Sequence, residues 1–427
     1  MAAEWEELSL RDAGISLIDC DHRTPPASET GYPYVTIPQL RHGRIELADA
    51  RRITREHYID WTRKAKPRPN DVVLSRRCNP GETAFVSPGM EFALGQNLVL
   101  LRADGTRVYP PFLRWLVRGP EWWRQVEKYI NVGAVFDSLK CKDIPNFRLR
   151  IPPVLIQRSI ADVLGALDDK IELNRKMSAT LEAMARAIFK SWFVDFDPVR
   201  AKAEGRRPEG MDEATAGLFP DRFGEDGLPE GWRQEPLDKL AIFLNGLALQ
   251  KYPPTGVNDL PVIKIAQLRA GSAGGADLSS GDVPPDYIVR DGDLLFSWSG
   301  SLMHRIWVGG NGALNQHLFK VTPVNRPKWL CYLWIDHHLP SFQAIAASKA
   351  TTMGHIQRHH LREAICILPP DNLLNQADKI VDPLFQRSIA CSLESSILAS
   401  LRDTLLPALV SGRLRVSDTE SVVKAAS

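Results

Sequence analysis

The chain has 427 residues, of which 44% are hydrophobic and 24% are charged, and its formal net charge is +2. This length predicts about two or three domains, each able to bury a core, and the composition excludes a chain too polar to fold. The near-neutral net charge neither indicates nor excludes a nucleic-acid partner, since basic residues can gather on one face.

The N-terminus and the cysteines indicate the compartment. The first residues, MAAEWEELSLRD, are acidic and lack the apolar core of a signal peptide. No apolar run approaches the length of a membrane span. The six cysteines are scattered and form no C-x-x-C pair, which favours reduced thiols over a disulfide framework or a zinc site. We therefore expect a cytoplasmic protein without a membrane segment.

An internal repeat runs along the chain. Residues 33–40 (PYVTIPQL) match residues 260–268 (LPVIKIAQL), residues 70–77 (NDVVLSRR) match residues 292–299 (GDLLFSWS), and residues 95–101 (GQNLVLL) match residues 315–321 (NQHLFKV). Each copy begins near a tryptophan, Trp5 or Trp232, and ends at an apolar-Pro-Pro step. Because the order of the matches is kept, the pattern predicts a duplicated domain rather than a solenoid.

Each copy has a mixed pattern of secondary structure. Runs such as VVLS, LVLL, DLLFSW and ICIL predict short buried strands. Residues 112–130 predict a helix interrupted at Gly119-Pro120, and their counterpart at residues 328–346 predicts a helix broken near Pro340. We expect an α+β protein with two similar α/β modules, residues 1–150 and 231–368, related by a pseudo-twofold internal repeat.

A long helix is expected after each module, at residues 151–194 and 369–416. Apolar residues recur at steps of three and four, as they do from Ile156 to Ile171, which is the spacing of a coiled-coil seam. Each apolar stripe needs a partner, so we predict that the two helices pair as an antiparallel coiled coil. Residues 195–230, rich in Gly, Pro and charge, predict a surface linker, and residues 417–427 form a tail.

Polar and proline residues interrupt the expected helices. Asn174 and Ser178 lie in the middle of the first seam, and Ser388 lies in the middle of the second. Asn174 either fixes the register of the pair, as a single buried polar residue can, or belongs to a solvated centre. Both interpretations remain open. Pro383 and Pro407 should kink the second helix or mark its frayed ends.

Motifs for catalysis and metal binding are missing from the sequence. It contains no G-x-x-x-x-G-K-[ST] phosphate loop and no G-x-G-x-x-G that follows a strand. The serines near His304 lack the G-x-S-x-G of a nucleophile elbow. No Cys or third His lies at ligand spacing from the histidine pairs at residues 337–338 and 359–360. The acidic pair Asp168-Asp169 falls on an expected helix, where a solvated face is the default. We therefore expect no catalytic residue and no metal site.

Basic, polar and aromatic residues gather in irregular segments at equivalent positions of both modules. Arg can read guanine, Asn and Gln can read adenine, and Lys, Ser and Thr hold phosphates. Any one of these residues alone is better explained as a solvated charge, but the matching clusters favour double-stranded DNA as the ligand. The candidate DNA-contacting residues are Lys64, Lys66, Arg68, Ser75, Arg76, Arg77 and Lys140 in the first module, and Ser297, Trp298, Ser299, His304, Arg305, Lys349, Thr351, Thr352, Gln357, Arg358 and His359 in the second.

Two long segments resemble a known family. Residues 151–210 (IPPVLIQRSIADVLGALDDKIELNRKMSATLEAMARAIFKSWFVDFDPVRAKAEGRRPEG) closely resemble the central region of DNA specificity subunits of type I restriction–modification systems, and residues 400–416 (SLRDTLLPALVSGRLRV) resemble their C-terminal region. The resemblance implies two target recognition domains, an antiparallel coiled coil, and docking of two methyltransferase and two restriction subunits. It implies no cofactor in this chain, because S-adenosylmethionine, ATP and Mg²⁺ would belong to the partner subunits. The recognition domains vary freely in this family, so the resemblance assigns no base contact.

The leading hypothesis is a non-enzymatic DNA-reading scaffold. Two reading modules on a stiff spacer suit a bipartite site, with half-site centres on the order of one helical turn apart. The modules differ at most candidate contacts, as Arg77 faces Ser299, so the site should be asymmetric. The alternative is a single-chain DNA methyltransferase or nuclease with a divergent active site, and a third possibility is a purely structural coiled-coil protein.

Overall fold

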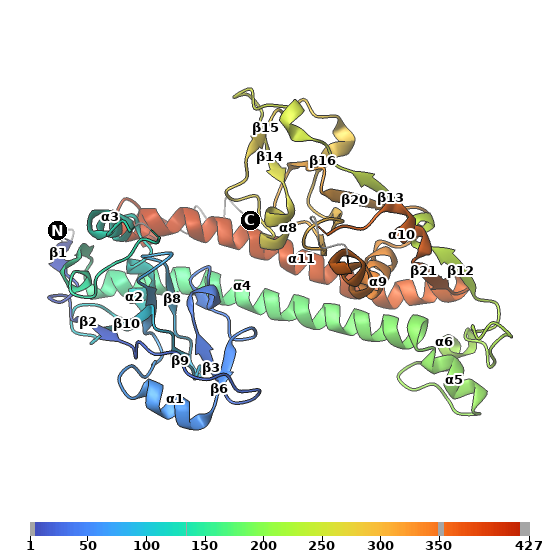
Figure 1. Cartoon of the computed structure of the whole chain (residues 1–427), viewed down its shortest axis with the longest axis horizontal. Helices are drawn as coiled ribbons and strands as arrows, with labels where there is room; N and C mark the ends of the chain where they lie inside the picture. Colours follow the sequence, from blue (N-terminus) through green and yellow to red (C-terminus); the bar gives the residue numbers. More distant parts are fainter. Residues whose placement is uncertain (1–4, 134, 349–353, 419–427) are drawn as a thin grey trace. The chain divides into compact units, whose positions relative to one another are not determined.

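The computed structural model describes residues 5–133, 135–348 and 354–418. The chain divides into two compact units (Figure 1): unit 1 comprises Met1–Asp169 with Leu398–Ser427, and unit 2 comprises Lys170–Ile397. Each unit therefore combines a β-rich domain with a part of each of the two long helices. Within the described ranges, no helix is both long and apolar enough to cross a membrane.

The β-rich domain of unit 1 has one central sheet and three smaller ones. The central sheet has the order β2-β10-β7-β8 and is antiparallel throughout, whereas β3 pairs with β6 antiparallel and with β9 parallel. The strands are β1 (Glu6–Ser9), β2 (Ile15–Asp19), β3 (Tyr32–Val35), β4 (Leu40–Arg41), β5 (Arg44–Ile45), β6 (Arg51–Ile53), β7 (Val72–Ser75), β8 (Thr83–Phe85), β9 (Ala93–Leu94), β10 (Leu98–Ala103) and β11 (Arg148–Ile151). The helices are α1 (Arg55–Thr62), α2 (Pro110–Leu116) and α3 (Pro120–Tyr129).

The β-rich domain of unit 2 repeats this plan. Its central antiparallel sheet has the order β13-β20-β17-β18, and β14 pairs with β19 parallel and with β15 antiparallel. The strands are β12 (Arg233–Pro236), β13 (Ala241–Asn245), β14 (Leu260–Ile263), β15 (Leu278–Ser279), β16 (Ile288–Val289), β17 (Leu294–Ser297), β18 (His304–Ile306), β19 (Gly312–Leu314), β20 (Leu318–Pro323) and β21 (Ile365–Leu368). The helices are α7 (Leu237–Leu240), α8 (Ile265–Ala270), α9 (Lys328–Ser348) and α10 (Arg358–Glu363).

The internal repeat predicted from the sequence is confirmed by the sheet topology. The three matched segments become β3 and β14, β7 and β17, and β10 and β20, which occupy the same places in the two sheets. The strand pairs that close each domain, β1 with β11 and β12 with β21, also correspond. The predicted interruption at Gly119-Pro120 is confirmed, because α2 ends before it and α3 begins at Pro120.

Both faces of each central sheet are buried. Successive side chains of a strand point to opposite faces, so Val72 and Leu74 of β7 pack with α2, α4 and α11, whereas Val73 packs with the β3–β9 layer. In unit 2, Leu294 packs toward α9 and the long helices, and Leu295 packs toward the β14–β19 layer. The strands are therefore continuous apolar runs, which is why they stood out in the sequence.

The long helices are α4 (Val154–Phe189) and α11 (Asp371–Val410), and α4 continues into a π-helical turn at Lys190–Val194. In each unit the two helices contact each other, as Asp168 does with Arg402 in unit 1. In unit 2, Asn174 contacts Glu394 and Ser178 contacts Ser388, so the residue numbers rise along α4 as they fall along α11. The predicted antiparallel pairing is therefore observed in unit 2.

The polar residues in the middle of the two helices contact each other in unit 2. The Asn174 side chain is buried, and its Nδ2 donates to Glu394 Oε2 over 2.9 Å. The Ser178 and Ser388 hydroxyls are buried and lie 2.8 Å apart. Since these groups are enclosed rather than hydrated, the structure favours a role in fixing register over a solvated centre.

The predicted helix break near Pro340 is wrong. Helix α9 continues through Pro340, and α11 continues through Pro383 and Pro407. A proline removes one helical N–H bond and costs about 3 kcal/mol in a helix interior. Buried residues on both sides, such as Trp334 and Phe342 around Pro340, hold the two halves of the helix on one core and offset this cost.

The segment expected to be a surface linker instead contributes to the core of unit 2. It contains α5 (Asp197–Ala203) and α6 (Glu213–Gly217). Val199 and Phe219 are buried in the same cluster as Trp232. The Gly, Pro and charged residues of this segment masked the few apolar residues that anchor it.

The acidic residue Asp168, expected on a solvated helix face, is buried in unit 1. Its Oδ1 accepts from Arg402 Nη1 over 2.6 Å, and its Oδ2 lies 3.7 Å from both Arg44 Nη2 and Arg114 Nη1. Burial lowers the pKa of Arg114 to about 10, with Asp168 acting in the opposite direction, so the guanidinium remains charged at neutral pH. This carboxylate therefore joins α2 and the β5 strand of the domain to both long helices.

Replacing Asp168 by Asn should destabilise unit 1 strongly. The substitution keeps the size of the side chain but leaves three arginines around an uncharged group, and breaking a buried ion pair costs about 3–5 kcal/mol. Thermal unfolding of Asp168→Asn should show a lowered transition temperature. The neighbouring Asp169 is exposed, so Asp169→Asn is a matched control that should unfold like the parent. Equal stability of the two variants would contradict the role given to Asp168.

Candidate nucleic-acid interface

The end of β7 is held by two other segments of unit 1. The Arg76 backbone N–H donates to Asn97 O over 2.9 Å, and the Leu139 N–H donates to Arg76 O over 2.8 Å. The buried Ser75 hydroxyl donates to Arg77 O over 2.9 Å. The strand end, the start of β10 and the segment after α3 therefore meet at one place.

Unit 2 has the same backbone hydrogen bonds around the end of its central strand, an arrangement that we call the frame, but its side chains there differ. The Trp298 N–H donates to His317 O over 3.4 Å, and the Ile356 N–H donates to Trp298 O over 2.9 Å. The buried Ser297 hydroxyl donates to Ser301 O over 2.6 Å. Trp298 thus occupies the place of Arg76, and Ser299 occupies the place of Arg77.

Arg77 and Lys140 are exposed beside the strand end of unit 1. The Arg77 backbone bridges to Ser138, and its guanidinium carbon lies 5.3 Å from the centroid of the Phe136 ring. Such a cation–π contact contributes about 0.5–1 kcal/mol at an exposed site. It holds the guanidinium at the surface without using its hydrogen-bond donors.

Arg76 is half-buried and only partly satisfied. Its Nε is buried and has no hydrogen-bond partner among the residues that the structure describes. A buried donor without a partner costs about 1–3 kcal/mol. Because this Nε is enclosed by the domain, a ligand does not reach it in this conformation, and Arg76 stays a candidate only through the exposed part of its side chain.

Four of the sequence candidates have buried side chains that serve the fold. Ser75 and Ser297 close the turn after their strands, as described above, and the Ser299 hydroxyl lies 2.9 Å from His317 Nδ1. The His304 side chain is only 4% exposed and packs on Tyr332, with ring centroids 4.5 Å apart. We therefore leave these four residues out of the interface.

His304 lies between the central sheet of unit 2 and the long helices. Its Nε2 is 3.5 Å from Asp336 Oδ1, and Asp336 Oδ2 accepts from Arg186 Nε over 2.8 Å. Burial lowers the pKa of His304 to about 4, and the carboxylate of Asp336 only partly opposes this effect. At neutral pH the imidazole is therefore uncharged and unsuited to holding a phosphate.

The basic segment Lys64, Lys66 and Arg68 is exposed but lies away from Arg77. It precedes β7, whereas Arg77 follows that strand, and an extended strand separates its ends by about 3.3 Å per residue. The structure therefore does not bring these two basic groups together. They would contact different parts of a nucleic acid.

The candidate residues of unit 2 differ in whether their side chains are exposed or already hydrogen-bonded within the unit. Gln357 and His359 are exposed at α10. Arg358 donates to Phe243 O over 3.3 Å, and Arg305 donates to Leu268 O over 3.1 Å. Trp298 Nε1 donates to Asn245 Oδ1 over 2.8 Å, and the Trp298 residue is half-buried. Lys349, Thr351 and Thr352 lie outside the described residues.

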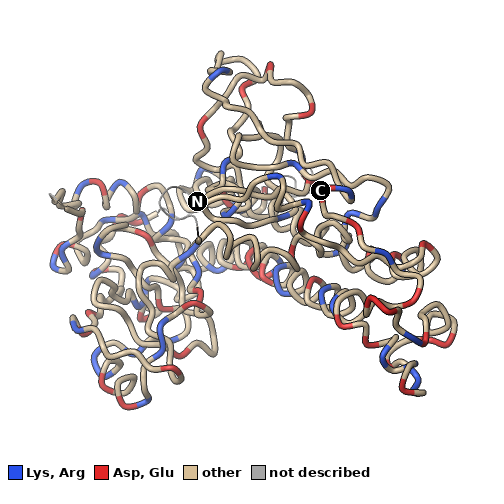
Figure 2. The backbone as a smooth tube through the Cα atoms, turned by 45° about the vertical axis from the view of Figure 1, so that its right-hand side comes forward, with Lys and Arg blue, Asp and Glu red and all other residues tan. Residues whose placement is uncertain are grey.

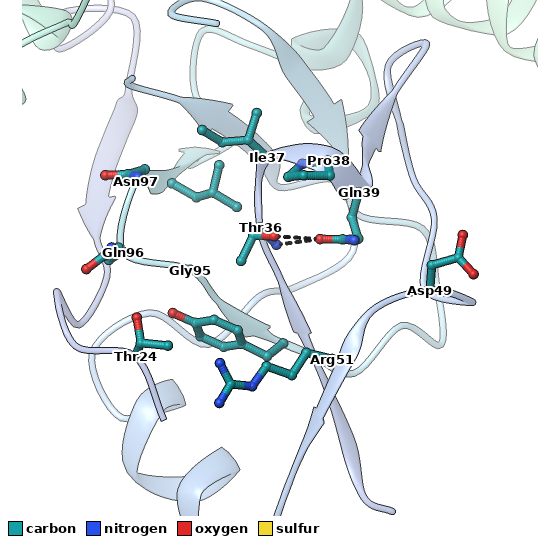
Figure 3. Close-up of a pocket in the computed structure, with 12 residues that line it drawn as sticks. Thr24, Thr36, Ile37, Pro38, Gln39, Asp49, Arg51, Gly95, Gln96 and Asn97 are labelled. Carbon is teal, nitrogen blue, oxygen red and sulfur yellow. Dashed lines mark hydrogen bonds between the residues drawn. The ribbon is translucent and has the colours of Figure 1, made fainter. Parts of the chain in front are cut away.

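A cavity of about 490 Å³ lies next to the strand end of unit 1, as Figure 3 shows. Gln96 and Asn97 line it, and their amides could read adenine. Gln39 also lines it, but its Oε1 accepts from the Thr36 N–H and hydroxyl over 3.0 and 2.7 Å. The matching Gln267 accepts from the Lys264 N–H over 3.3 Å. The repeated glutamine therefore closes a turn in both units.

Two groups of potential metal ligands occur among the described residues, Asp19 with Cys20 and His22, and His359 with His360 and Glu363. The His22 ring lies between Asp19 Oδ2 and Gln96 O, at 3.0 and 3.1 Å. Burial raises the pKa of Cys20 to about 12, so the thiol is protonated at neutral pH. In the first group, hydrogen bonds within the domain account for the arrangement.

Charge alone does not outline the interface. Lys and Arg alternate with Asp and Glu along the helices and loops of both units (Figure 2). Many basic side chains are paired, as Arg102 is with Asp71 over 2.7 Å. The frame around the strand ends is therefore a better guide than the density of basic residues.

Sequence reasoning missed the apolar part of this region. Val132, Val135 and Phe136 are exposed beside Arg77, although only the polar residues around them stood out as candidates. It also missed Gln96 and Asn97, which lie in the repeated segment 95–101. The alignment of that segment with residues 315–321 is the sequence signal that could have identified them, because it places both amide side chains next to the strand end.

Comparisons with known proteins agree on one family. Residues 4–183 match the type I restriction modification DNA specificity domain. The HindI specificity subunit of Haemophilus influenzae is 25% identical over 410 residues, covering 81% of this chain and 86% of that protein. The MjaIX specificity subunit of Methanocaldococcus jannaschii is 25% identical over 307 residues, covering 68% of this chain and 66% of that protein.

The fold also matches a solved structure. The crystal structure of the type I restriction-modification S subunit from M. genitalium covers 95% of this chain and 96% of its own, with a TM-score of 0.52 and 15% identity. Both have mixed α and β structure, with two long helices that pack together and β-rich domains. The predicted fold class is therefore confirmed.

The buried His304 should make unit 2 sensitive to acid. Because its pKa in the folded state, about 4, lies below the ordinary value of 6.5, the unfolded chain binds the proton more tightly. Stability should therefore fall as the pH decreases from about 6.5 to about 4. Thermal unfolding across this range should show a shallower pH dependence for His304→Gln. His57→Gln, in a half-exposed position of α1, is the control and should keep the slope of the parent.

Proposed function

This chain belongs to the specificity subunits of type I restriction–modification systems, and we propose that it recognises an asymmetric, bipartite DNA site and holds the other subunits on it. Specificity subunits are the non-catalytic members of these enzymes and carry no cofactor. S-adenosylmethionine and ATP are used by the methyltransferase and restriction subunits. The alternative of a single-chain enzyme is therefore set aside.

The observation that carries the proposal is a duplicated frame with unlike side chains. In each unit, the residue after the central strand is bonded through its backbone to the same two neighbouring segments. The side chains placed there differ, since Arg76 corresponds to Trp298 and Arg77 corresponds to Ser299. The first unit therefore offers guanidinium groups to a base at this place, whereas the second offers none there because the Ser299 hydroxyl is buried, so two unlike half-sites are expected.

The domain assignment follows from this frame. We assign the first target recognition domain to residues 1–150 and the second to residues 231–368. The long helices, residues 151–194 and 369–416, would carry both domains and dock two methyltransferase subunits, with two restriction subunits joining for cleavage. This stoichiometry is what the resemblance to the family implies.

A host that expresses this chain with its methyltransferase partner should methylate one asymmetric, bipartite motif. Sequencing of modified bases across the genome measures this directly. Exchanging residues 1–150 for the corresponding domain of another specificity subunit should change one half of the motif and leave the other half intact. A palindromic motif, or no motif in a culture where the complex assembles, would contradict the proposal.

Arg77→Ala should weaken binding to the specific duplex by about 1–3 kcal/mol and relax one base position, because a bidentate contact to a base is lost. Binding of the complex to duplexes with each base changed in turn would show this. Arg68→Ala removes an exposed arginine at the opposite end of β7 and is the matched control, for which no single position should relax. An equal loss for Arg77→Ala on specific and random DNA would assign Arg77 to phosphate instead.

A further inference from the structure

We propose that an apolar finger of the first recognition domain reads a thymine methyl group in its half-site. The finger consists of residues 131–133 and 135–138, and its reading side chains are Val135 and Phe136. The proposal rests on the function proposed above and extends it, because it assigns a specificity-determining contact to residues without hydrogen-bonding groups.

The finger is built as a closed turn with a buried anchor. Asn131 and Ser138 pair through two backbone hydrogen bonds of 2.8 and 3.0 Å. A Cβ atom at Gly133 would lie only 2.4 Å from Phe136 O, so the turn requires glycine there. Leu139, which follows directly, is 1% exposed and bonds to Arg76 O. The base of the finger is therefore fixed to the end of β7.

The tip of the finger exposes apolar surface, although Arg77 lies over the ring of Phe136. Val132 is 79% exposed, Val135 is 87% exposed and Phe136 is 43% exposed. Burying such side chains gains roughly 25 cal/mol per Å² of apolar area. A short turn could expose polar residues at no cost, so a cluster of three apolar residues at its tip indicates a contact with another molecule.

DNA is the partner that suits the surroundings of the tip. Arg77, Lys140 and Lys142 are exposed around the base of the finger. The acidic residue of the finger, Asp137, is half-buried and accepts from the Gly133 N–H over 3.4 Å. A duplex offers phosphates to Lys140 and Lys142 and base edges to Arg77 and the tip at the same time.

A methyl contact fits the geometry better than insertion between base pairs. Apolar side chains that wedge between base steps stack on both neighbours. Arg77 already covers one face of the Phe136 ring, at 5.3 Å, so stacking of bases on both faces would have to break this contact. The edge of the ring and the Val135 methyl groups remain free. The C5-methyl of thymine is the apolar group that the major groove presents to such side chains.

The second module anchors a segment at the same place. The Ser299 backbone bridges to His355, as that of Arg77 bridges to Ser138. The Gly300 N–H donates to Gly354 O over 2.8 Å. Backbone contacts at the strand end thus anchor a following segment in both modules, and the residues of the two segments differ in sequence. This is the pattern expected of a reading element.

The test uses the complex with its methyltransferase subunits and the motif found by modified-base sequencing. Each thymine of the first half-site is replaced in turn by deoxyuridine, which lacks only the methyl group. For the parent complex, one replacement should weaken binding about four-fold, the effect of about one buried methyl group. The double variant Val135→Ser, Phe136→Ser should bind the thymine and deoxyuridine duplexes equally. Ile59→Ser, at another exposed apolar residue of this domain, should retain the four-fold difference.

Several outcomes would overturn the proposal while the proposed function stands. These are a first half-site without thymine, an unchanged ratio in the double variant, and no effect of any single methyl group. A fluorescence increase of 2-aminopurine in the half-site that depends on Phe136 would show insertion instead. Matching thermal unfolding of the parent and the serine variants excludes a folding defect as the cause.

Discussion

The structure depends on the packing of α4 against α11, because neither helix can bury its apolar stripe alone. The contacts between them are partly polar, and this matters for uniqueness. An apolar seam tolerates a shift of one heptad, whereas a buried amide or hydroxyl must find its partner. The Asn174 contact to Glu394 and the Ser178 contact to Ser388 each demand one alignment of the two helices. Polar seam residues lower the stability of the helix pair somewhat, but they fix a single register.

The β-rich domain of each unit is joined to the helices by an ion pair, buried in unit 1 and partly exposed in unit 2, and the two pairs have opposite polarity. In unit 1 the acid is on the helix, where Asp168 receives Arg114 and Arg44 from the domain. In unit 2 the acid is on the domain, where Asp336 receives Arg186 from α4. Like charges would meet if the domain of one unit packed against the helix segment that the domain of the other unit contacts. The two ion pairs therefore discriminate between the two docking positions on the helices, and they also stabilise each domain on its own position.

Sequence alone predicted the duplicated domains, the central strands and the long helices, since buried runs and regular spacing leave a strong signal. It failed where tertiary packing overrides local preference. Pro340 lies inside a helix because buried residues flank it, and the segment around Val199 and Phe219 packs into the core despite its polar composition. At the interface, the serines shared by both copies are frame residues. A repeat alignment cannot separate shared packing from shared binding. The exposed Phe136 carried no polar signal, so only the structure reveals it.

The frame explains how recognition could diverge without loss of the fold. At the strand ends the backbone supplies the structural hydrogen bonds, from Arg76 N–H to Asn97 O in one unit and from Trp298 N–H to His317 O in the other. These backbone bonds do not depend on the side chains, so the side chain at this position can differ between the copies, as an arginine does from Trp298, which itself packs on the core of unit 2. Residues whose side chains hold the frame, such as Ser75 and Ser297, cannot vary in this way. Differences between the copies thus mark reading positions, and identities mark the scaffold that aims them.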